Sequence, residues 1–331
     1  MREIAKKVGV NPTTVSRALR KDPRVKLSTR IHIEQAAEEM GYTRDAALSA
    51  LNAYRNQKQS HRIENVMAWV TNFSEPDGWR QFSTYTQIFE AMQPVAAKAG
   101  YRVEEFWVNE QHMPSKRLSE ILRARGIRGV FLGVTREHDA YIQLDWEHFS
   151  ALSLCLRYGK HKLNAVRRDY FHDVELSTTQ LIQNGARRPI FILKNRLDQY
   201  QGRIVRSAFE STTRDLLGKV GPVFVCPQDQ PSEQIRTWIR KSRADAVLTN
   251  FNKEYNVALQ KIAPSEHPLC ASLHTLEDTL PGILFEPEVI ATTAIHQLIG
   301  MMHRFEQGIP HHPLVTHIPG RWTDGKPTIQ G

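Results

Sequence analysis

The apolar residues of the first forty positions recur at helical spacing and predict three short helices. The first helix ends at Gly9, a residue that suits a helix C-terminus. Asn11 can cap the second helix, which has Pro12 in its first turn and runs to about Leu19. The third begins near Ser28. The apolar positions of the three helices are Ile4, Ala5 and Val8, then Val15, Ala18 and Leu19, and finally Ile33, Ala36, Ala37 and Met40. Two short helices joined by a tight glycine turn, the second capped and basic, form a helix-turn-helix pattern.

Beyond residue 62, short apolar runs alternate with longer amphipathic segments. The runs that predict strands are Val66–Val70, Val103–Val108, Gly129–Val134, Leu152–Leu156, Pro189–Leu193, Val223–Cys226, Ala246–Leu248 and Leu269–Leu273. Helices are predicted over Tyr85–Ala99, Lys116–Arg125, Asp173–Asn184, Arg206–Leu217, Ser232–Arg243, Glu254–Ile262 and Glu288–Glu306. Near-continuous apolar strands separated by helices indicate an α/β core with parallel strands, and this many strands favours two sheets. Ligands of such sheets bind at the carboxyl ends of the strands.

A segment of good helix formers, Arg44–Arg55, joins the two patterns and is followed by the polar residues 56–62. The sequence therefore predicts an all-α helix-turn-helix head over residues 1–43, a connecting helix and linker over 44–62, and an α/β core over 63–331.

Positive charge is concentrated in the head and the linker. Residues 1–62 hold 13 Lys and Arg against 6 Asp and Glu, a formal charge of +7 out of +9 for the whole chain. A basic head on a nearly neutral core favours a polyanion-binding module attached to another domain. A solvated basic surface is the alternative, and charge alone does not decide between the two.

The composition limits the class of protein. With 40% hydrophobic and 24% charged residues, wholesale disorder is excluded. The apolar runs are far shorter than the roughly 20 residues that cross a bilayer, and the first residues show no signal-peptide pattern. Three widely spaced cysteines, Cys155, Cys226 and Cys270, suit a reducing compartment better than a disulfide framework. We therefore expect a cytoplasmic protein without a membrane partner.

Motifs of catalysis and metal binding are missing from the sequence. It contains no GxSxG elbow, P-loop, HExxH or CxxC. His311 and His312 are adjacent rather than spaced for one helix face, so we expect a surface pair and not a ligand pair. We expect no enzyme, no metal and no cofactor.

The run Thr14-Val15-Ser16-Arg17, followed by Asp22 to Val25 and by Gly41-Tyr42, is specific. In these residues the head resembles the LacI/GalR (lactose repressor/galactose repressor) family of bacterial transcription regulators. The core resembles the same family more weakly, at Arg125 to Val130, Asp169, Gln180 to Gly185, Arg187 to Ile192 and Gly308-Ile309-Pro310. The resemblance implies a two-lobed core like that of a periplasmic binding protein. Lobe 1 would hold about residues 63–160 and 287–312, and lobe 2 about 161–286 and 313–331.

The core departs from the family pattern at positions close to the expected cleft. Asp173 stands in place of a glycine, and Phe251 stands in place of an aspartate after Asn250. His274 takes the place of an aspartate that contacts the sugar in the family. These changes leave the expected DNA binding intact and bear on the identity of the effector.

The second helix of a helix-turn-helix enters the major groove with its N-terminal side chains nearest the base edges. Arg17 is the best candidate for paired hydrogen bonds to guanine, with a phosphate contact as the alternative. Thr13 can touch a base edge or a thymine methyl group, and Pro12 offers apolar contact. We expect Thr14, Ser16 and the helix N-terminus to hold phosphates. Asn11 and Arg20 complete the predicted contacts of this helix with DNA.

The segment Arg44–Arg55 resembles the hinge helix of the family, which pairs with its copy in a second subunit and enters the minor groove. Leu51 aligns with the leucine that wedges between base steps and kinks the DNA, and Leu48 lies on the same stripe. The alternative is that both leucines form a core stripe against another helix.

Aromatic and polar side chains near the ends of predicted strands are the candidates for effector binding. The candidates are Phe73, Trp79, Tyr85, Arg157, Arg203, Asn250 and His274. Aromatic faces can cover a sugar ring, whereas arginine and histidine in place of acids favour an acidic or modified sugar, such as a uronic acid or a sugar phosphate. Alternatively, the basic groups pair with acids such as Asp169 or Glu286 and leave the cleft neutral.

The sequence therefore predicts a DNA-binding transcription regulator, with repression as the favoured direction, controlled by a small-molecule effector between two lobes. Because one head reads only a half-site, we expect a homodimer on a pseudo-palindromic double-stranded operator. Two alternatives are a sugar-processing enzyme with an accessory DNA-binding head, and a constitutive DNA binder with a vestigial pocket.

Overall fold

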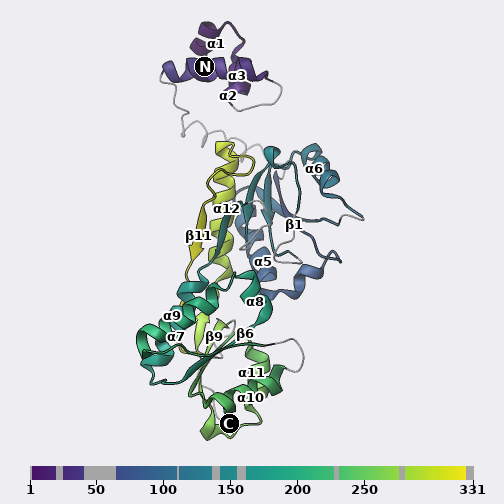
Figure 1. Cartoon of the computed structure of the whole chain (residues 1–331). Helices are drawn as coiled ribbons and strands as arrows, with labels where there is room; N and C mark the ends of the chain where they lie inside the picture. Colours follow the sequence, from purple (N-terminus) through teal and green to yellow (C-terminus); the bar gives the residue numbers. More distant parts are fainter. Residues whose placement is uncertain are drawn as a thin grey trace.

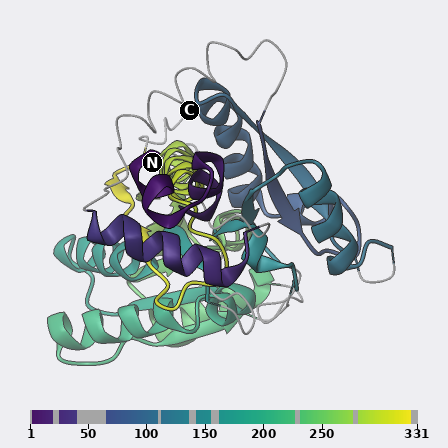
Figure 2. The same cartoon turned by 90° about the horizontal axis from the view of Figure 1, so that it is seen from above.

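The computed structural model describes residues 2–19, 25–40, 65–109, 112–135, 142–154, 162–226, 231–275 and 280–325. The predicted connecting helix and linker lie outside these ranges. The head consists of α1 (Arg2–Val8), α2 (Pro12–Leu19) and α3 (Leu27–Glu39), drawn in purple in Figures 1 and 2. Their shared core is formed by Ile4, Ala5, Val15, Ala18, Ile33, Ala36 and Ala37. The three predicted helices of the head are confirmed.

Local contacts explain where the helices of the head begin and end. Gly9, at the turn after α1, has a positive φ of 71°, a conformation that glycine adopts without strain. The Asn11 side-chain oxygen accepts a hydrogen bond of 2.9 Å from the Thr13 backbone N–H and so caps α2. Lys7 and Glu39 form an ion pair of 2.6 Å that joins α1 to α3.

The first sheet of the core contains six parallel strands in the order β11-β5-β4-β3-β1-β2. The strands are β1 (Asn65–Thr71), β2 (Tyr101–Trp107), β3 (Gly129–Leu132), β4 (Ser150–Ser153), β5 (Asn164–Arg168) and β11 (Val315–Ile318). The helices that accompany this sheet are η1 (Gly78–Gln81), α5 (Ser83–Lys98), α6 (Ser115–Ala124), η2 (Trp146–His148) and α12 (Pro287–Arg304). One face of the sheet packs on α5 and α12, and the other on α6.

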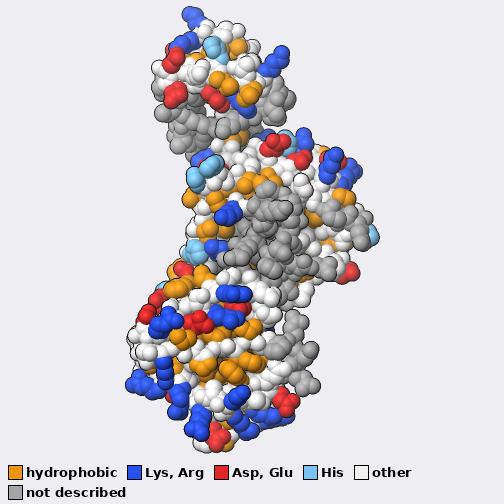
Figure 3. Space-filling view, viewed as in Figure 1, with side chains coloured by type: hydrophobic (Ala, Val, Ile, Leu, Met, Phe, Trp, Pro, Cys, Tyr) orange, Lys and Arg blue, Asp and Glu red, His pale blue; other side chains and the backbone are white. Residues whose placement is uncertain are grey.

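The second sheet has the order β12-β10-β9-β8-β6-β7, with only β12 antiparallel to its neighbour. Its strands are β6 (Pro189–Lys194), β7 (Val223–Cys226), β8 (Ala246–Thr249), β9 (Leu269–Thr275), β10 (Gly282–Leu284) and β12 (Arg321–Thr323). Its helices are α7 (Tyr170–Gln183), α8 (Asn195–Tyr200), α9 (Ile204–Leu217), α10 (Pro231–Ser242), α11 (Asn252–Leu259) and η3 (Pro264–Glu266). Figure 1 shows α7 and α9 on one side of this sheet and α10 and α11 on the other. In the same view, Figure 3 shows many Lys and Arg side chains on the surface of this lobe.

Within the described residues the chain passes between the two sheets three times. The crossings follow β5, β10 and β11, so each lobe is assembled from segments that are far apart in the sequence. The predicted two-lobed α/β architecture with parallel sheets is therefore confirmed.

The division between the lobes differs in detail from the expected one. β5 and β11 pair with each other and belong to the first sheet, so the first lobe extends to Arg168 and again to Ile318, beyond the expected bounds near 160 and 312. Neither strand has a purely apolar sequence. Asn164–Arg168 ends in two arginines, and Val315–Ile318 lies at the edge of the sheet with alternate residues exposed.

Candidate functional site

Helix α2 presents the predicted DNA contacts on its exposed side. Asn11, Pro12, Thr13 and Arg17 are exposed and Thr14 is half-buried, whereas Val15 and Ala18 are fully buried in the head. Thr13 and Arg17 are four residues apart, so they share one face of the helix. The side chain of Ser16 is not among those that the structure describes, and Arg20, Leu48 and Leu51 lie outside the described residues.

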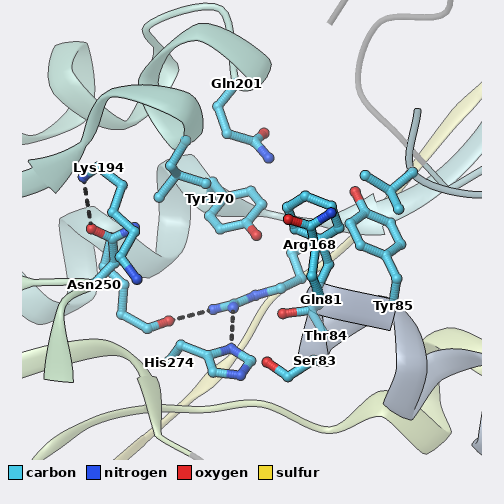
Figure 4. Close-up of a pocket in the computed structure, with 14 residues that line it drawn as sticks. Gln81, Ser83, Thr84, Tyr85, Arg168, Tyr170, Lys194, Gln201, Asn250 and His274 are labelled. Atoms are coloured by element: carbon cyan, nitrogen blue, oxygen red, sulfur yellow. Dashed lines mark hydrogen bonds between the residues drawn. The ribbon is translucent and has the colours of Figure 1, made fainter. Parts of the chain in front are cut away.

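A cavity of about 290 Å³ lies between the two sheets, at the carboxyl ends of several strands. Figure 4 shows its lining side chains converging from both lobes. The lining residues are Gln81, Phe82, Ser83, Thr84, Tyr85, Val134, Arg168, Tyr170, Lys194, Leu197, Gln201, Asn250, Leu273 and His274. Three of the predicted effector contacts, Tyr85, Asn250 and His274, therefore line one cavity.

Arg168, the last residue of β5, lies at the first crossing and is held by several partners. Its side chain is 6% exposed, and its Nη2 atom donates to Asp173 Oδ2 at 2.6 Å, within an ion pair whose carboxylate is fully buried. Nη2 also donates to the Leu273 carbonyl at 2.8 Å, and Nη1 lies 3.2 Å from His274 Nδ1. The guanidinium lies 5.4 Å from the centre of the Phe285 ring, which belongs to the second crossing.

Asp173 extends this network to the third crossing, because its Oδ1 atom accepts the Gly320 backbone N–H at 2.8 Å. A Cβ atom on Gly320 would lie 2.8 Å from the same oxygen and 2.2 Å from Ile283, so glycine is required for this close approach. One buried ion pair thus contacts all three connections between the lobes.

His274 lies beside Arg168 on the wall of the cavity (Figure 4). Its backbone is fixed by Ser272, whose hydroxyl accepts the His274 N–H at 3.0 Å, and by Asn252, whose side chain donates to the His274 carbonyl at 2.7 Å. The pKa of His274 is lowered to about 3, mainly by burial and to a smaller extent by the positive charges of Arg168 and Lys194. The imidazole is therefore uncharged at neutral pH.

Lys194 supplies a second positive charge at the end of β6. Its Nζ atom lies 4.8 Å from the centre of the Phe251 ring and 3.9 Å from Glu254, and its side chain is 45% exposed. The Lys194 backbone N–H donates to Asn250 Oδ1 at 3.0 Å, which orients the amide of Asn250 (Figure 4). Neither Arg168 nor Lys194 was among the predicted effector contacts. The rule that ligands bind at the carboxyl ends of strands could have found Lys194, which follows the predicted strand Pro189–Leu193, but not Arg168, whose strand was not predicted.

Phe73 and Trp79 are core residues and do not line the cavity, which corrects the prediction for both. Trp79 is fully buried against Trp69 and Phe89, with ring centres 5.4 Å apart in each pair, and its indole N–H donates to Glu105 at 3.1 Å. Phe73 is 5% exposed and its carbonyl accepts the Trp107 indole N–H at 2.7 Å. Both rings pack in the core between η1, α5 and the first sheet, and so they are not available to a ligand in the cavity.

Arg203 does not line the cavity either. It is exposed, precedes α9 with a left-handed φ of 66°, and donates its backbone N–H to the Asp198 carbonyl at 2.8 Å. Arg206, one turn further on, pairs with the Asp198 carboxylate. Arg157 lies outside the described residues.

The two acids that were expected to neutralise the cleft have other partners. Glu286 accepts from Arg321 Nε at 2.8 Å, and Asp169 caps α7 by accepting the His172 N–H at 3.1 Å. The cavity lining contains no Asp or Glu among the residues that the structure describes. Its electrostatic character is set by Arg168, whose charge Asp173 offsets, and by the partly exposed Lys194.

The described ranges contain no group of three His, Cys, Asp or Glu side chains placed to hold a metal ion. His311 and His312 contact each other on the surface, with Nδ1 and Nε2 3.0 Å apart. Across the same ranges, every helix is too short or too polar to reach from one side of a membrane to the other.

Residues 1–45 match the family model described as bacterial regulatory proteins of the lacI family. The search of curated proteins found no match to this chain.

Solved structures of regulators share the fold of nearly the whole chain. The lac repressor dimer bound to operator and the anti-inducer ONPF superimposes with a TM-score of 0.59 at 16% identity, covering 98% of this chain and 97% of that one. The CelR–cellobiose complex gives a TM-score of 0.54 at 14% identity, covering 98% of both chains. The Cra dual regulator from Pseudomonas putida, in complex with fructose 1-phosphate, gives 0.54 at 13% identity, covering 79% of this chain and 99% of that one. The head of this chain thus matches the lacI family of bacterial regulatory proteins, and the chain shares its fold with these solved regulators.

Proposed function

We propose that this protein is a sequence-specific, DNA-binding transcription regulator whose operator affinity is set by a small molecule in the cavity between its lobes. The observation that carries the proposal is the capped helix α2, which turns Thr13 and Arg17 outward from a head that matches the lacI family. A helix N-terminus with exposed Thr and Arg side chains suits entry into a major groove. We take repression to be the direction of control and the cytoplasm to be its location.

We propose a homodimer because one helix-turn-helix head is too small to cover a whole operator. One helix-turn-helix covers a half-site, so two heads related by a two-fold axis read a pseudo-palindromic operator. The similar lac repressor is a dimer bound to operator, which supports the same arrangement here.

We propose that the ligand of the cavity is an acidic or phosphorylated sugar. Hydroxyl and amide side chains, among them Ser83, Thr84 and Asn250, can bind sugar hydroxyls, and the ring of Tyr85 offers a face. Lys194 places a partly unneutralised positive charge at the rim, and the described lining contains no carboxylate that would repel an anion. The similar Cra regulator was solved with fructose 1-phosphate, which is such a ligand.

An enzyme and a constitutive DNA binder are less well supported. His274 has one ring nitrogen engaged with Arg168 and a pKa near 3, which makes it a poor general base at neutral pH. The polar side chains that line the cavity from both lobes favour a ligand-controlled regulator over a constitutive DNA binder with a vestigial pocket.

The DNA-binding proposal predicts a steep dependence of operator affinity on salt. In a selection from random duplexes, the protein should enrich a pseudo-palindrome, and log affinity should fall with log salt by about 0.9 per phosphate neutralised. The Arg17→Ala variant should lose its base preference at one position in each half-site, with a loss of binding free energy of roughly 1–3 kcal/mol per half-site. Lys26→Ala, in an exposed residue before α3, should weaken binding to all sequences alike. Unchanged base preference in the Arg17 variant would remove its role in reading the operator.

The ligand proposal predicts that acidic sugars raise the melting temperature more than their neutral counterparts do. Glucose 6-phosphate and galacturonate would be compared with glucose and galactose in a thermal-shift assay. Lys194→Met should reduce the stabilisation by the acidic sugars, because it removes the exposed charge at the cavity. Lys253→Met is the matched control, since Lys253 is exposed on the same lobe and does not line the cavity. Equal stabilisation by neutral sugars, insensitive to Lys194→Met, would contradict the proposal.

A further inference from the structure

We infer that His274 recognises the ligand with a single fixed hydrogen-bond donor, its Nε2–H, and that Arg168, oriented by Asp173, holds it in that state. The inference rests on the proposed ligand cavity and specifies one atom of the ligand: the group next to His274 must present an oxygen that accepts a hydrogen bond. His274 is a specificity-determining residue in this scheme, and Arg168 and Asp173 are positioning residues.

The tautomer of His274 follows from its neighbour. A guanidinium group has N–H donors and no acceptor. Nη1 of Arg168 lies 3.2 Å from His274 Nδ1, so this contact is favourable only if Nδ1 is unprotonated and accepts. In a neutral imidazole the proton then resides on Nε2.

Arg168 cannot easily turn away from the histidine. Its Nε and Nη2 atoms donate to the same Asp173 oxygen at 3.2 and 2.6 Å, and Nη2 also donates to the Leu273 carbonyl. Its planar group lies against the rings of Tyr170 and Phe285, at 4.8 and 5.4 Å from their centres. These contacts define the plane of the guanidinium and therefore the direction in which Nη1 points.

The surroundings also keep the imidazole uncharged. The charged groups near it are Arg168 from β5 and Lys194 from β6, and the acids Asp173 and Glu254 lie behind these two cations as their partners. The Phe285 ring packs on the imidazole at 4.8 Å between centres. A second proton on His274 would be placed between two positive charges in a buried site, consistent with the lowered pKa.

The donor that remains has no partner in the described part of the protein. Nε2 of His274 is buried from solvent and makes no hydrogen bond there. Buried donors are almost always satisfied, and this one belongs to a residue that lines the cavity, so we assign it to a ligand oxygen that reaches it when the ligand is bound. An aspartate, which the family resemblance places at this position, can only accept when it is ionised. The histidine therefore reverses the polarity of this contact.

The first experiment observes the ring directly in the ligand-free, full-length protein. After labelling with ¹⁵N-histidine, the signals lost in His274→Gln identify residue 274 among the 14 histidines. We expect one protonated nitrogen, Nε2, and one unprotonated nitrogen, Nδ1, unchanged between about pH 7 and pH 5, where an ordinary histidine becomes charged. A protonated Nδ1, or a charged ring in this range, would overturn the inference.

The positioning role is tested by removing both charges together, because removal of one would leave the other buried and alone. In Arg168→Met/Asp173→Leu we expect His274 to show a mixture of the two tautomers. Retention of the pure Nε2–H form would show that Arg168 does not set it. Arg168→Lys keeps a cation that can donate but loses the planar geometry, and we expect a partial mixture there, which keeps the role testable if the double variant does not fold.

A second measurement needs no spectroscopic assignment. The unfolded chain takes up a proton on His274 near the ordinary pKa of 6.5, whereas the folded protein does not until about pH 3. Below pH 6.5 the unfolded state binds more protons, so His274 lowers stability as the pH falls. The melting temperature of the wild type should drop more between about pH 7 and pH 5 than that of His274→Gln. An equal drop in both proteins would contradict the uncharged state.

Binding provides the final test, with glucose 6-phosphate and galacturonate as the probes. His274→Gln retains an N–H donor and should keep most of the affinity, whereas His274→Asp replaces the donor with an anionic acceptor and should lose at least about tenfold. Equal binding by the Asp variant would overturn the inference. If neither probe binds the wild type, the proposed effector class fails, while the tautomer and pH results still decide the state of His274.

Discussion

Replacing Asp173 with alanine should lower the free energy of unfolding of the core by about 3–5 kcal/mol, because it leaves a buried arginine without its counter-charge. The Arg168 side chain is 6% exposed and Asp173 is fully buried. The same change removes the acceptor of the Gly320 backbone N–H at the third crossing. The loss should appear as an earlier midpoint of urea unfolding, followed by tryptophan fluorescence.

Two comparisons separate this effect from the mere loss of a carboxylate. Asp215→Ala, in an exposed residue of α9, should change the midpoint little. Arg168→Met/Asp173→Leu should recover most of the stability, since a buried ion pair can often be replaced by apolar residues without loss. A loss of under about 1 kcal/mol for Asp173→Ala would show that solvent reaches the pair.

Ile33→Ala should abolish operator binding while leaving the core folded. Ile33 is fully buried at the centre of the head, in a core whose other members include four alanines. Truncating a buried isoleucine costs about 2–5 kcal/mol, and a domain of this size is stable by only a few kcal/mol in total. The head should then be largely unfolded at working temperature.

Ile31→Ala is the matched control, because Ile31 is 46% exposed on the same helix. Fluorescence anisotropy on a labelled operator should show loss of binding for Ile33→Ala and near-normal binding for Ile31→Ala. The melting transition of the core, and its response to any stabilising sugar, should be the same in both variants. Operator binding retained by Ile33→Ala would mean that the head has stability beyond its own core.

The helices of the head could be predicted closely because their signals are local. The cap at Asn11, the proline at the first turn and the glycine before them act within one or two turns of the chain. The apolar strands of the core were found for a similar reason, since strands buried on both faces are continuous apolar runs. β5 was not predicted because it ends in two charged residues, Arg167 and Arg168, rather than in an apolar run. Asp173, from the following helix, pairs with Arg168 in the folded protein.

The candidate site was predicted only in part, because its composition depends on which strand ends meet. Asn250 and His274 lie at strand ends that meet at the cavity, whereas Arg203 precedes a helix and does not line the cavity. Trp79 was placed in the cavity because it follows a strand closely. Its indole fills the space between η1, α5 and the sheet, and periodicity does not reveal such packing. The partnership of Arg168 with Asp173 spans the first crossing, which could be located only once the sheets were known.

The three crossings between the lobes also fix when the protein can finish folding during its synthesis. The described core of the head, from Ile4 to Ala37, is complete once residue 40 has left the ribosome. The first lobe lacks β11 until Ile318 has been made, and the second lacks β12 until Thr323. Until then, β5 has an open edge on which another chain could pair, which is a route to aggregation of incomplete chains. A ribosome stalled before residue 315 would therefore display a finished head on an unfinished core.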